Sequence, residues 1–242
     1  VRRAFPGVGV VIGGIDASLR RLAHYDYWSD KVRRSILLDS KADILVYGMG
    51  EKQAVEIARR LASGEEIKKL DNIPGTVVAR NTLEYLKNFI VIPSYEEASK
   101  DKDKFNEAFR KIYEEQDALR GRSIVQKHGE RYAVQFPPAL PLTADEMDSL
   151  YSHDFAMRPH PEYDKEGGVP GFEAVRWSVV SHRGCPGECS FCSLYMHQGR
   201  IVQSRTRKSI LDEIGRVASR KDFKGTITDI GGPTVNLYAA VC

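Results

Sequence analysis

The chain has little cysteine, no long apolar run and almost no excess charge. Only four of its 242 residues are cysteine, and no run approaches the ~20 apolar residues that a membrane helix needs. The 36 basic and 33 acidic residues leave a net charge of +3, which gives no broad electrostatic argument for binding nucleic acid. We therefore expect a cytoplasmic protein with no disulfide framework, no membrane partner and no nucleic-acid partner.

The N-terminus also lacks two features. It has no starting methionine and no apolar segment of the kind found in signal peptides. An apolar content of 42% and a charged content of 29% are typical of a globular protein. We expect the chain to be part of a longer protein.

Short apolar runs that end in glycine alternate with amphipathic segments in the first 80 residues. This alternation predicts a parallel α/β sheet. The expected strands cover residues 9–14, 42–48 and 75–79, and the expected helices cover residues 17–25 and 51–62. Glycines lie at the ends of the expected strands, where open sheets bind ligands (Gly13, Gly14, Gly48 and Gly50). They do not match the motif G-x-G-x-x-G, so they are weak evidence for a phosphate-binding site.

The middle of the chain predicts a different organisation. Residues 95–116 are highly charged and predict one long helix, and residues 123–126 and 132–136 predict a hairpin. A proline-rich connector follows and ends near residue 168. We therefore place an α/β domain at residues 1–167 and a second domain at residues 168–242. We expect His153, His160 and Tyr163 of the connector to be partly solvated.

The second domain predicts one strand–helix–strand unit. Residues 174–181 predict a strand, 209–218 a helix and 225–230 a second strand. The first strand leads into a loop with three cysteines, and the second leads into Gly231 and Gly232. Because the carboxyl ends of parallel strands meet at one edge, we expect both features on the same rim, where active sites assemble.

Three of the four cysteines lie within eight residues, at Cys185, Cys189 and Cys192. Clustered thiolates bind soft metals, so the loop predicts either an iron–sulfur cluster or zinc. Structural zinc usually has four ligands in two close pairs. Three unevenly spaced cysteines favour iron–sulfur, although His182 or His197 could supply a fourth ligand. A basic segment follows the loop, and we expect it to be a solvated helix start (Arg200, Arg205, Arg207 and Lys208).

The cysteine loop is similar to the signature of the radical S-adenosylmethionine (radical SAM) enzymes. That signature has the form C-x3-C-x-aromatic-C after a first strand, and here Phe191 is the aromatic residue. Short sequence motifs on both sides of the loop resemble those of the YgiQ-type branch of this superfamily, whose members are largely uncharacterised (residues 11–18, 24–29, 47–51, 183–185, 197–200 and 229–234).

The resemblance implies a [4Fe-4S] cluster held by Cys185, Cys189 and Cys192. It also implies that S-adenosylmethionine binds the fourth iron and is cleaved by one electron to a 5′-deoxyadenosyl radical, which abstracts a substrate hydrogen. An electron donor such as flavodoxin or ferredoxin is then needed. The resemblance places S-adenosylmethionine beside five residues, with the apolar ring of Phe191 near the adenine or simply packed under the loop (Phe191, Gly231, Gly232, Pro233 and Thr234). Many members have Glu after the glycine pair, so here backbone carbonyls or Thr234 would bind the methionine ammonium.

The resemblance also implies the fold. The first domain would be a partial cobalamin-binding-like sheet of Rossmann or flavodoxin type, and the second would be the start of a radical SAM partial TIM barrel. The cobalamin-binding motif D-x-H-x-x-G is absent from the sequence, and we expect the domain to bind no cobalamin. No motif identifies the substrate. The alternative function is a non-enzymatic interaction module stabilised by zinc or an iron–sulfur cluster.

Overall fold

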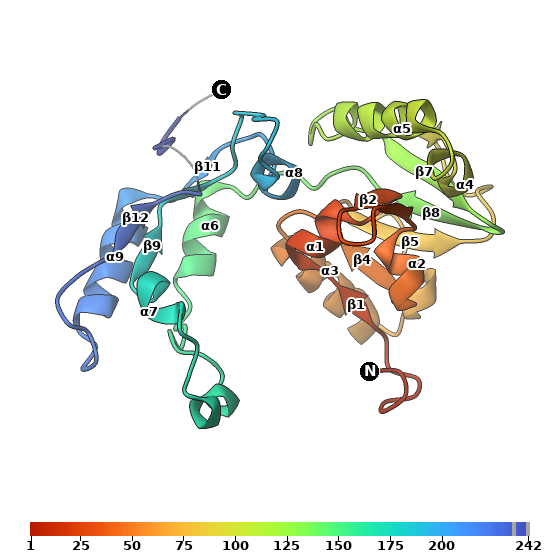
Figure 1. Cartoon of the computed structure of the whole chain (residues 1–242). Coiled ribbons are helices and arrows are strands. Elements are labelled where there is room, and N and C mark those ends of the chain that lie inside the picture. The colour runs from red at the N-terminus through yellow and green to blue at the C-terminus, as the bar shows by residue number, and fades with distance from the viewer. Residues whose placement is uncertain (234–235, 241–242) are drawn as a thin grey trace. The chain divides into compact units, whose positions relative to one another are not determined.

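The computed structural model describes residues 1–233 and 236–240, which form two compact units (Figure 1). The first unit comprises Val1–Leu140 and Phe191–Gly199, and the second comprises Pro141–Ser190 and Arg200–Cys242. Segment 191–199, which follows most of the cysteine loop, thus packs with the first unit. The domain division at residue 168 is not tested by any comparison and stays a prediction.

A mixed six-stranded sheet forms the centre of the first unit, with strand order β1-β4-β5-β8-β7-β6. Only the β1–β4 and β6–β7 pairs are parallel, and the other three are antiparallel. The expectation of a parallel sheet was therefore wrong in part, because β5 runs antiparallel to β4 and the β7–β8 hairpin enters the sheet on the other side of β5. The strands are β1 (Val11–Ile12), β4 (Ile44–Val46), β5 (Thr76–Arg80), β6 (Phe89–Ile92), β7 (Ser123–His128) and β8 (Arg131–Gln135), and a separate hairpin pairs β2 (His24–Asp26) with β3 (Lys31–Arg33).

The helices of the first unit confirm one prediction and correct two. Helix α3 (Glu51–Ala62) has the expected bounds, whereas α1 (Gly14–Leu19) is shorter than expected. The long charged segment divides into α4 (Tyr95–Ala98) and α5 (Lys102–Glu114). The Asp101 side chain accepts the backbone N–H of Asp103 at 2.8 Å and so starts a new helix inside the charged run. The other helical elements are α2 (Ile36–Ser40), η1 (Ile67–Lys69) and α8 (Leu194–Gln198).

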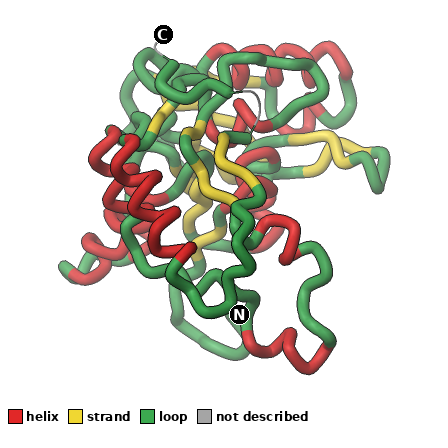
Figure 2. Tube along the Cα trace, turned by 90° about the vertical axis from the view of Figure 1, so that its left-hand side faces the viewer, coloured by secondary structure: helices red, strands yellow, loops and turns green. Residues whose placement is uncertain are grey.

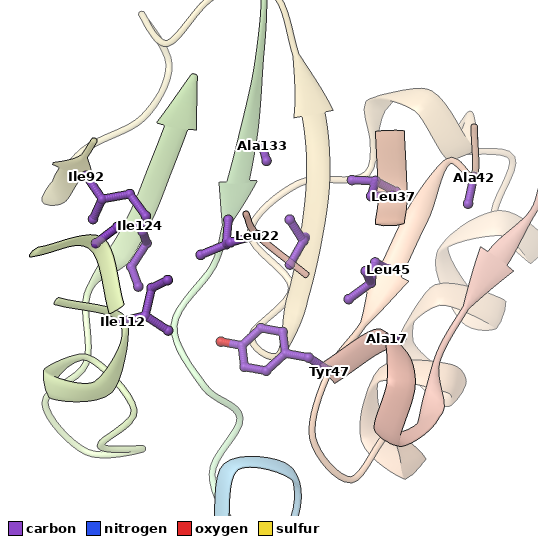
Figure 3. Packing of buried hydrophobic residues seen from close by; sticks show 12 residues of the cluster. Ala17, Leu22, Leu37, Ala42, Leu45, Tyr47, Ile92, Ile112, Ile124 and Ala133 are labelled. Atoms are coloured by element: carbon purple, nitrogen blue, oxygen red, sulfur yellow. The ribbon is translucent and has the colours of Figure 1, made fainter. Parts of the chain in front are cut away.

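Apolar side chains cover both faces of this sheet. Leu45 and Ile44 are neighbours on β4, yet each belongs to a different core cluster, as the alternation of side chains along a strand requires. One cluster packs against α1, α2 and α5 (Figure 3), and the other packs against α3. Within the first cluster, the buried Tyr47 hydroxyl donates to the Phe136 carbonyl at 2.6 Å. The sheet is thus a buried layer between helices.

The second unit is built around a parallel pair of short strands, β9 (Ser178–Val180) and β12 (Asp229–Gly231). Helix α9 (Arg207–Ala218) connects them along the chain, as predicted. The segment before β9 was expected to be strand but contains helix α7 (Phe172–Val175). The remaining elements are α6 (Ala144–Tyr151), η2 (Pro161–Glu166), β10 (His182–Arg183) and β11 (Gln203–Ser204), joined by the loops drawn green in Figure 2. In the described part of the chain, no helix combines the length and apolar character needed to span a membrane.

One buried histidine in the first unit makes stability depend on pH. His128 is 5% exposed, and its ring stacks on Tyr95 with ring centroids 5.6 Å apart. Neither ring nitrogen has a hydrogen-bond partner among the residues that the structure describes. Burial disfavours the charged imidazolium and lowers the pKa of His128 from 6.5 to about 4.

We predict that the protein loses stability as the pH falls from about 6.5 to about 4. In that window the unfolded chain takes up a proton at residue 128 and the folded chain does not, so protonation favours unfolding by up to about 3 kcal/mol. His128→Phe should keep the stacking on Tyr95 and flatten this part of the pH profile, as measured by urea unfolding at several pH values. The exposed His153→Gln should keep the wild-type profile, and equal pH slopes for all three proteins would contradict the prediction.

Candidate cofactor site

The cysteine loop and the glycine pair lie at the same end of the β9–β12 strand pair. Val180 of β9 is in register with Gly231 of β12, and the Ser181 N–H donates to the Gly231 carbonyl at 2.8 Å. The chain then runs through β10 directly to Cys185. The shared rim predicted from sequence is therefore confirmed, with β10 as an additional two-residue strand between β9 and the loop.

Gly184 lets the chain turn from β10 into the cysteine loop. Its φ of +85° lies in the region that favours glycine, and a Cβ here would lie 2.2 Å from the Ile201 carbonyl oxygen. On the other side of the loop, Arg200 Nε lies 2.8 Å from Glu188 Oε1 in an ion pair. The close approach of Gly184 to Ile201 thus holds the start of the loop, and the Arg200–Glu188 ion pair holds its middle.

All three loop cysteines are free thiols. The sulfurs of Cys185 and Cys189 lie 3.3 Å and 3.7 Å from the position that a Cβ of Gly187 would take, so the loop turns both toward one point. Cys192 belongs to the segment that packs with the first unit. Among residues 1–233 and 236–240, no three His, Cys, Asp or Glu side chains are grouped as a metal site. The ligand role of the three cysteines stays a prediction, and the soft donors fit iron–sulfur or zinc.

The residues predicted to contact S-adenosylmethionine fall into three groups. Gly231 and Gly232 line an open cavity of about 560 Å³ within the second unit. Phe191 is 92% exposed, and its position beside the adenine stays a prediction. Pro233 is half-buried and directly follows the glycine pair, and Thr234 lies outside the described residues.

His182 fixes the glycine pair against β10. Its ring is fully buried, and its Nε2 accepts the Leu237 N–H at 3.3 Å. Nδ1 therefore carries the proton and donates to Ser181 Oγ at 2.9 Å. A Cβ on Gly232 would lie 2.2 Å from His182 Nε2, so only glycine fits beside this ring. Sequence reasoning considered His182 as a metal ligand and missed this packing role.

His197 is also engaged through Nδ1, inside the first unit. Ser18 Oγ donates to the Gly14 carbonyl at 3.0 Å and accepts the Gly48 N–H at 3.0 Å. It lies 2.8 Å from His197 Nδ1, which is therefore the donor of that pair. The contact holds α8 on α1. As expected, the connector residues His153, His160 and Tyr163 are exposed.

A buried ion pair supports the rim from below. The Arg205 side chain is 0% exposed and the Glu213 side chain 7%, and the two form a short ion pair. Arg205 Nη1 also donates to the Val180 carbonyl at 2.8 Å, and its guanidinium lies 4.3 Å from the centre of the Tyr151 ring. The expectation that Arg205 is solvated was wrong. No short motif identifies this pair, because Arg205 precedes the predicted helix and its burial depends on contacts with both Glu213 and Val180.

The fold and rim define an α/β protein with a cysteine loop at the carboxyl end of a parallel strand pair. The family model described as Radical SAM N-terminal matches residues 1–178. The chain therefore belongs to the radical SAM N-terminal family, and the resemblance to the YgiQ-type branch is confirmed.

The relatives are UPF0313 proteins. The chain is 50% identical over 242 residues to one from Clostridium botulinum (strain ATCC 19397 / Type A) and 47% identical over 242 residues to one from Methanocella arvoryzae. Both alignments cover all of this chain, which spans 38% and 40% of the two relatives. A solved structure of the radical S-adenosylmethionine methyltransferase TsrM from Kitasatospora setae, with tryptophan and a SAM analogue bound, aligns with 96% of this chain and 30% of its own, at 19% identity and a TM-score of 0.46.

We predict that Gly232→Ala destabilises the second unit by about 2 kcal/mol, because the new methyl group overlaps the buried His182 ring. The matched control is Gly215→Ala on α9, where a Cβ meets nothing within 4 Å. That change should be neutral or stabilising, since alanine favours helix by up to about 1 kcal/mol over glycine. Urea unfolding measures both, and similar values for the two variants would contradict the packing role of His182.

We predict that Glu213→Ala costs about 3–5 kcal/mol, because it leaves the Arg205 charge buried without its partner. Asp212→Ala breaks the exposed Lys208–Asp212 pair on the same helix and should cost less than about 0.5 kcal/mol. Chemical unfolding compares the two directly. A small cost for Glu213→Ala would show that the buried pair does not support the unit.

Proposed function

We propose that the full-length protein is a radical SAM enzyme whose [4Fe-4S] cluster is held by Cys185, Cys189 and Cys192. The observation that carries the proposal is the position of the cysteine loop, on the same rim as Gly231 of the neighbouring parallel strand. Membership of the radical SAM N-terminal family supports it. This chain spans 38% of its first relatives, so the substrate site of the whole protein is part of the proposal, not of the described residues.

The residues of the chain would act as ligands and as a scaffold. Three thiolates bind three irons and leave one iron for S-adenosylmethionine. When bound, the cluster supplies one electron that breaks the sulfonium C–S bond, giving methionine and a 5′-deoxyadenosyl radical that takes a hydrogen atom from the substrate. Gly231 and Gly232 leave space for the methionine end of the cofactor beside the backbone. Phe191, 92% exposed, offers an apolar ring for the adenine. Flavodoxin or ferredoxin would supply the electron.

The β9–α9–β12 unit would be the first part of a partial TIM barrel. The parallel pairing of β9 with β12 supports this. The mixed sheet of the first unit would correspond to a cobalamin-binding-like domain. That it binds no cobalamin stays a prediction.

The test is reconstitution of the full-length protein with iron and sulfide under anaerobic conditions. We expect about four irons per chain, as in one [4Fe-4S] cluster. We also expect 5′-deoxyadenosine to form after reduction with dithionite in the presence of S-adenosylmethionine. Alanine at Cys185, Cys189 or Cys192 should abolish both iron retention and product, whereas Cys242→Ala should preserve them. Stoichiometric zinc without iron in anaerobically purified protein would instead support the interaction module.

A further inference from the structure

The cavity beside the glycine pair contains one acidic side chain. Of the described residues that line it, only Asp229 carries a carboxylate and only Arg207 carries a positive charge. No ion pair joins these two side chains in the described part of the chain. Neither side chain has a hydrogen bond or ion pair to another described residue. A cavity that contains one acidic and one basic side chain is complementary to a zwitterion, such as the amino-acid end of S-adenosylmethionine.

Asp229 lies directly over Gly231. The two residues are two positions apart on β12, so their side-chain positions share one face of the strand. The carboxylate oxygens of Asp229 lie 3.5 Å and 3.7 Å from the point that a Cβ of Gly231 would occupy. Because glycine has no side chain, the space next to this carboxylate is open. An ammonium group placed there could form a charged hydrogen bond to Asp229.

Several aspartates of the second unit have side-chain partners, whereas Asp229, like Asp145 and Asp154, has none among the described residues. Of these three aspartates without partners, Asp229 is the one that lines the cavity. The carboxylate of Asp148 accepts the Thr206 N–H at 3.0 Å, and Asp222 pairs with Arg176 and Arg220. Asp212 pairs with Lys208. These carboxylates hold helices and loops together, whereas no described residue forms a hydrogen bond or ion pair with the carboxylate of Asp229. Asp229 therefore has its full accepting capacity available for a ligand.

We propose that Asp229 binds the methionine ammonium of S-adenosylmethionine, an inference that rests on the proposed function. It assigns to a residue before the glycine pair the role that sequence reasoning gave to backbone carbonyls or Thr234 after it. Gly231 is then needed to leave room for the ammonium beside the carboxylate. Asp229 begins β12, and its carboxylate extends along the strand to Gly231, which is the last residue of β12 and lies on the rim.

The experiment uses the full-length, cluster-loaded protein and titrates S-adenosylmethionine while the spectrum of the reduced cluster is followed by electron paramagnetic resonance. Asp229→Asn should keep the wild-type iron and sulfide content and weaken binding about 10-fold or more, the effect of losing one charged hydrogen bond. The control Asp212→Asn should bind with wild-type affinity.

A second ligand separates binding from folding. The analogue of S-adenosylmethionine that lacks the amino group should bind equally to wild type and Asp229→Asn, because the contact that the substitution removes is already absent. Equal affinity of the two proteins for S-adenosylmethionine, or an equal loss for both ligands, would overturn the role of Asp229. A wild-type protein that holds its cluster but binds no S-adenosylmethionine would instead overturn the proposed function itself.

Discussion

The second unit depends on the buried pair between Arg205 and Glu213. Burying two charges is favourable only when further hydrogen bonds satisfy them, and Arg205 also donates to the Val180 carbonyl and to Ser209. Val180 is the last residue of β9, and Glu213 lies in the middle of α9. One guanidinium therefore joins the strand that leads into the cysteine loop to the helix that follows it. The guanidinium groups of Arg205 and of Arg183 on β10 lie 4.3 Å and 5.3 Å from the centre of the Tyr151 ring, and so connect this region to α6.

At the rim, the backbone passes so close to neighbouring groups that two positions accept only glycine. Gly184 passes the Ile201 carbonyl and Gly232 passes the His182 ring, each at a distance that leaves no room for a methyl group. The two glycines act on different parts of the rim: one turns the chain into the cysteine loop, and the other brings the end of β12 against β10. A cofactor that binds both the loop and the glycine pair needs both parts in register. His182 on β10 helps to hold the two parts together, because its ring packs against Gly232 and its Nε2 accepts the N–H of Leu237, which follows the glycine pair.

Sequence reasoning succeeded where a local signal and the global fold agree. Helix α3, the β7–β8 hairpin and the parallel pairing of β9 with β12 follow from apolar periodicity and from glycines at strand ends. It failed in other cases. The break before Lys102 comes from one local capping aspartate in a charged run. Strand β5 runs antiparallel to β4, and on its other side it pairs with β8, which belongs to a hairpin some 50 residues later in the chain. Arg205 was misjudged because its burial depends on Glu213 and Val180 together, which no short motif reveals.

The flanking histidines bear on the choice between zinc and an iron–sulfur cluster. A closed zinc site at this loop needs a fourth ligand, and His182 and His197 were the candidates close in sequence. Both nitrogens of His182 are already hydrogen-bonded inside a fully buried position, so ligation would require leaving Leu237 or Ser181. Nδ1 of His197 is committed to Ser18 on α1. This hydrogen bond orients the ring and leaves ligation through Nε2 chemically open, so the structure argues against His182 as a zinc ligand and not against His197. Three thiols are the donor set that leaves one iron of a four-iron cluster open to a further ligand, which is the arrangement that the proposed chemistry needs.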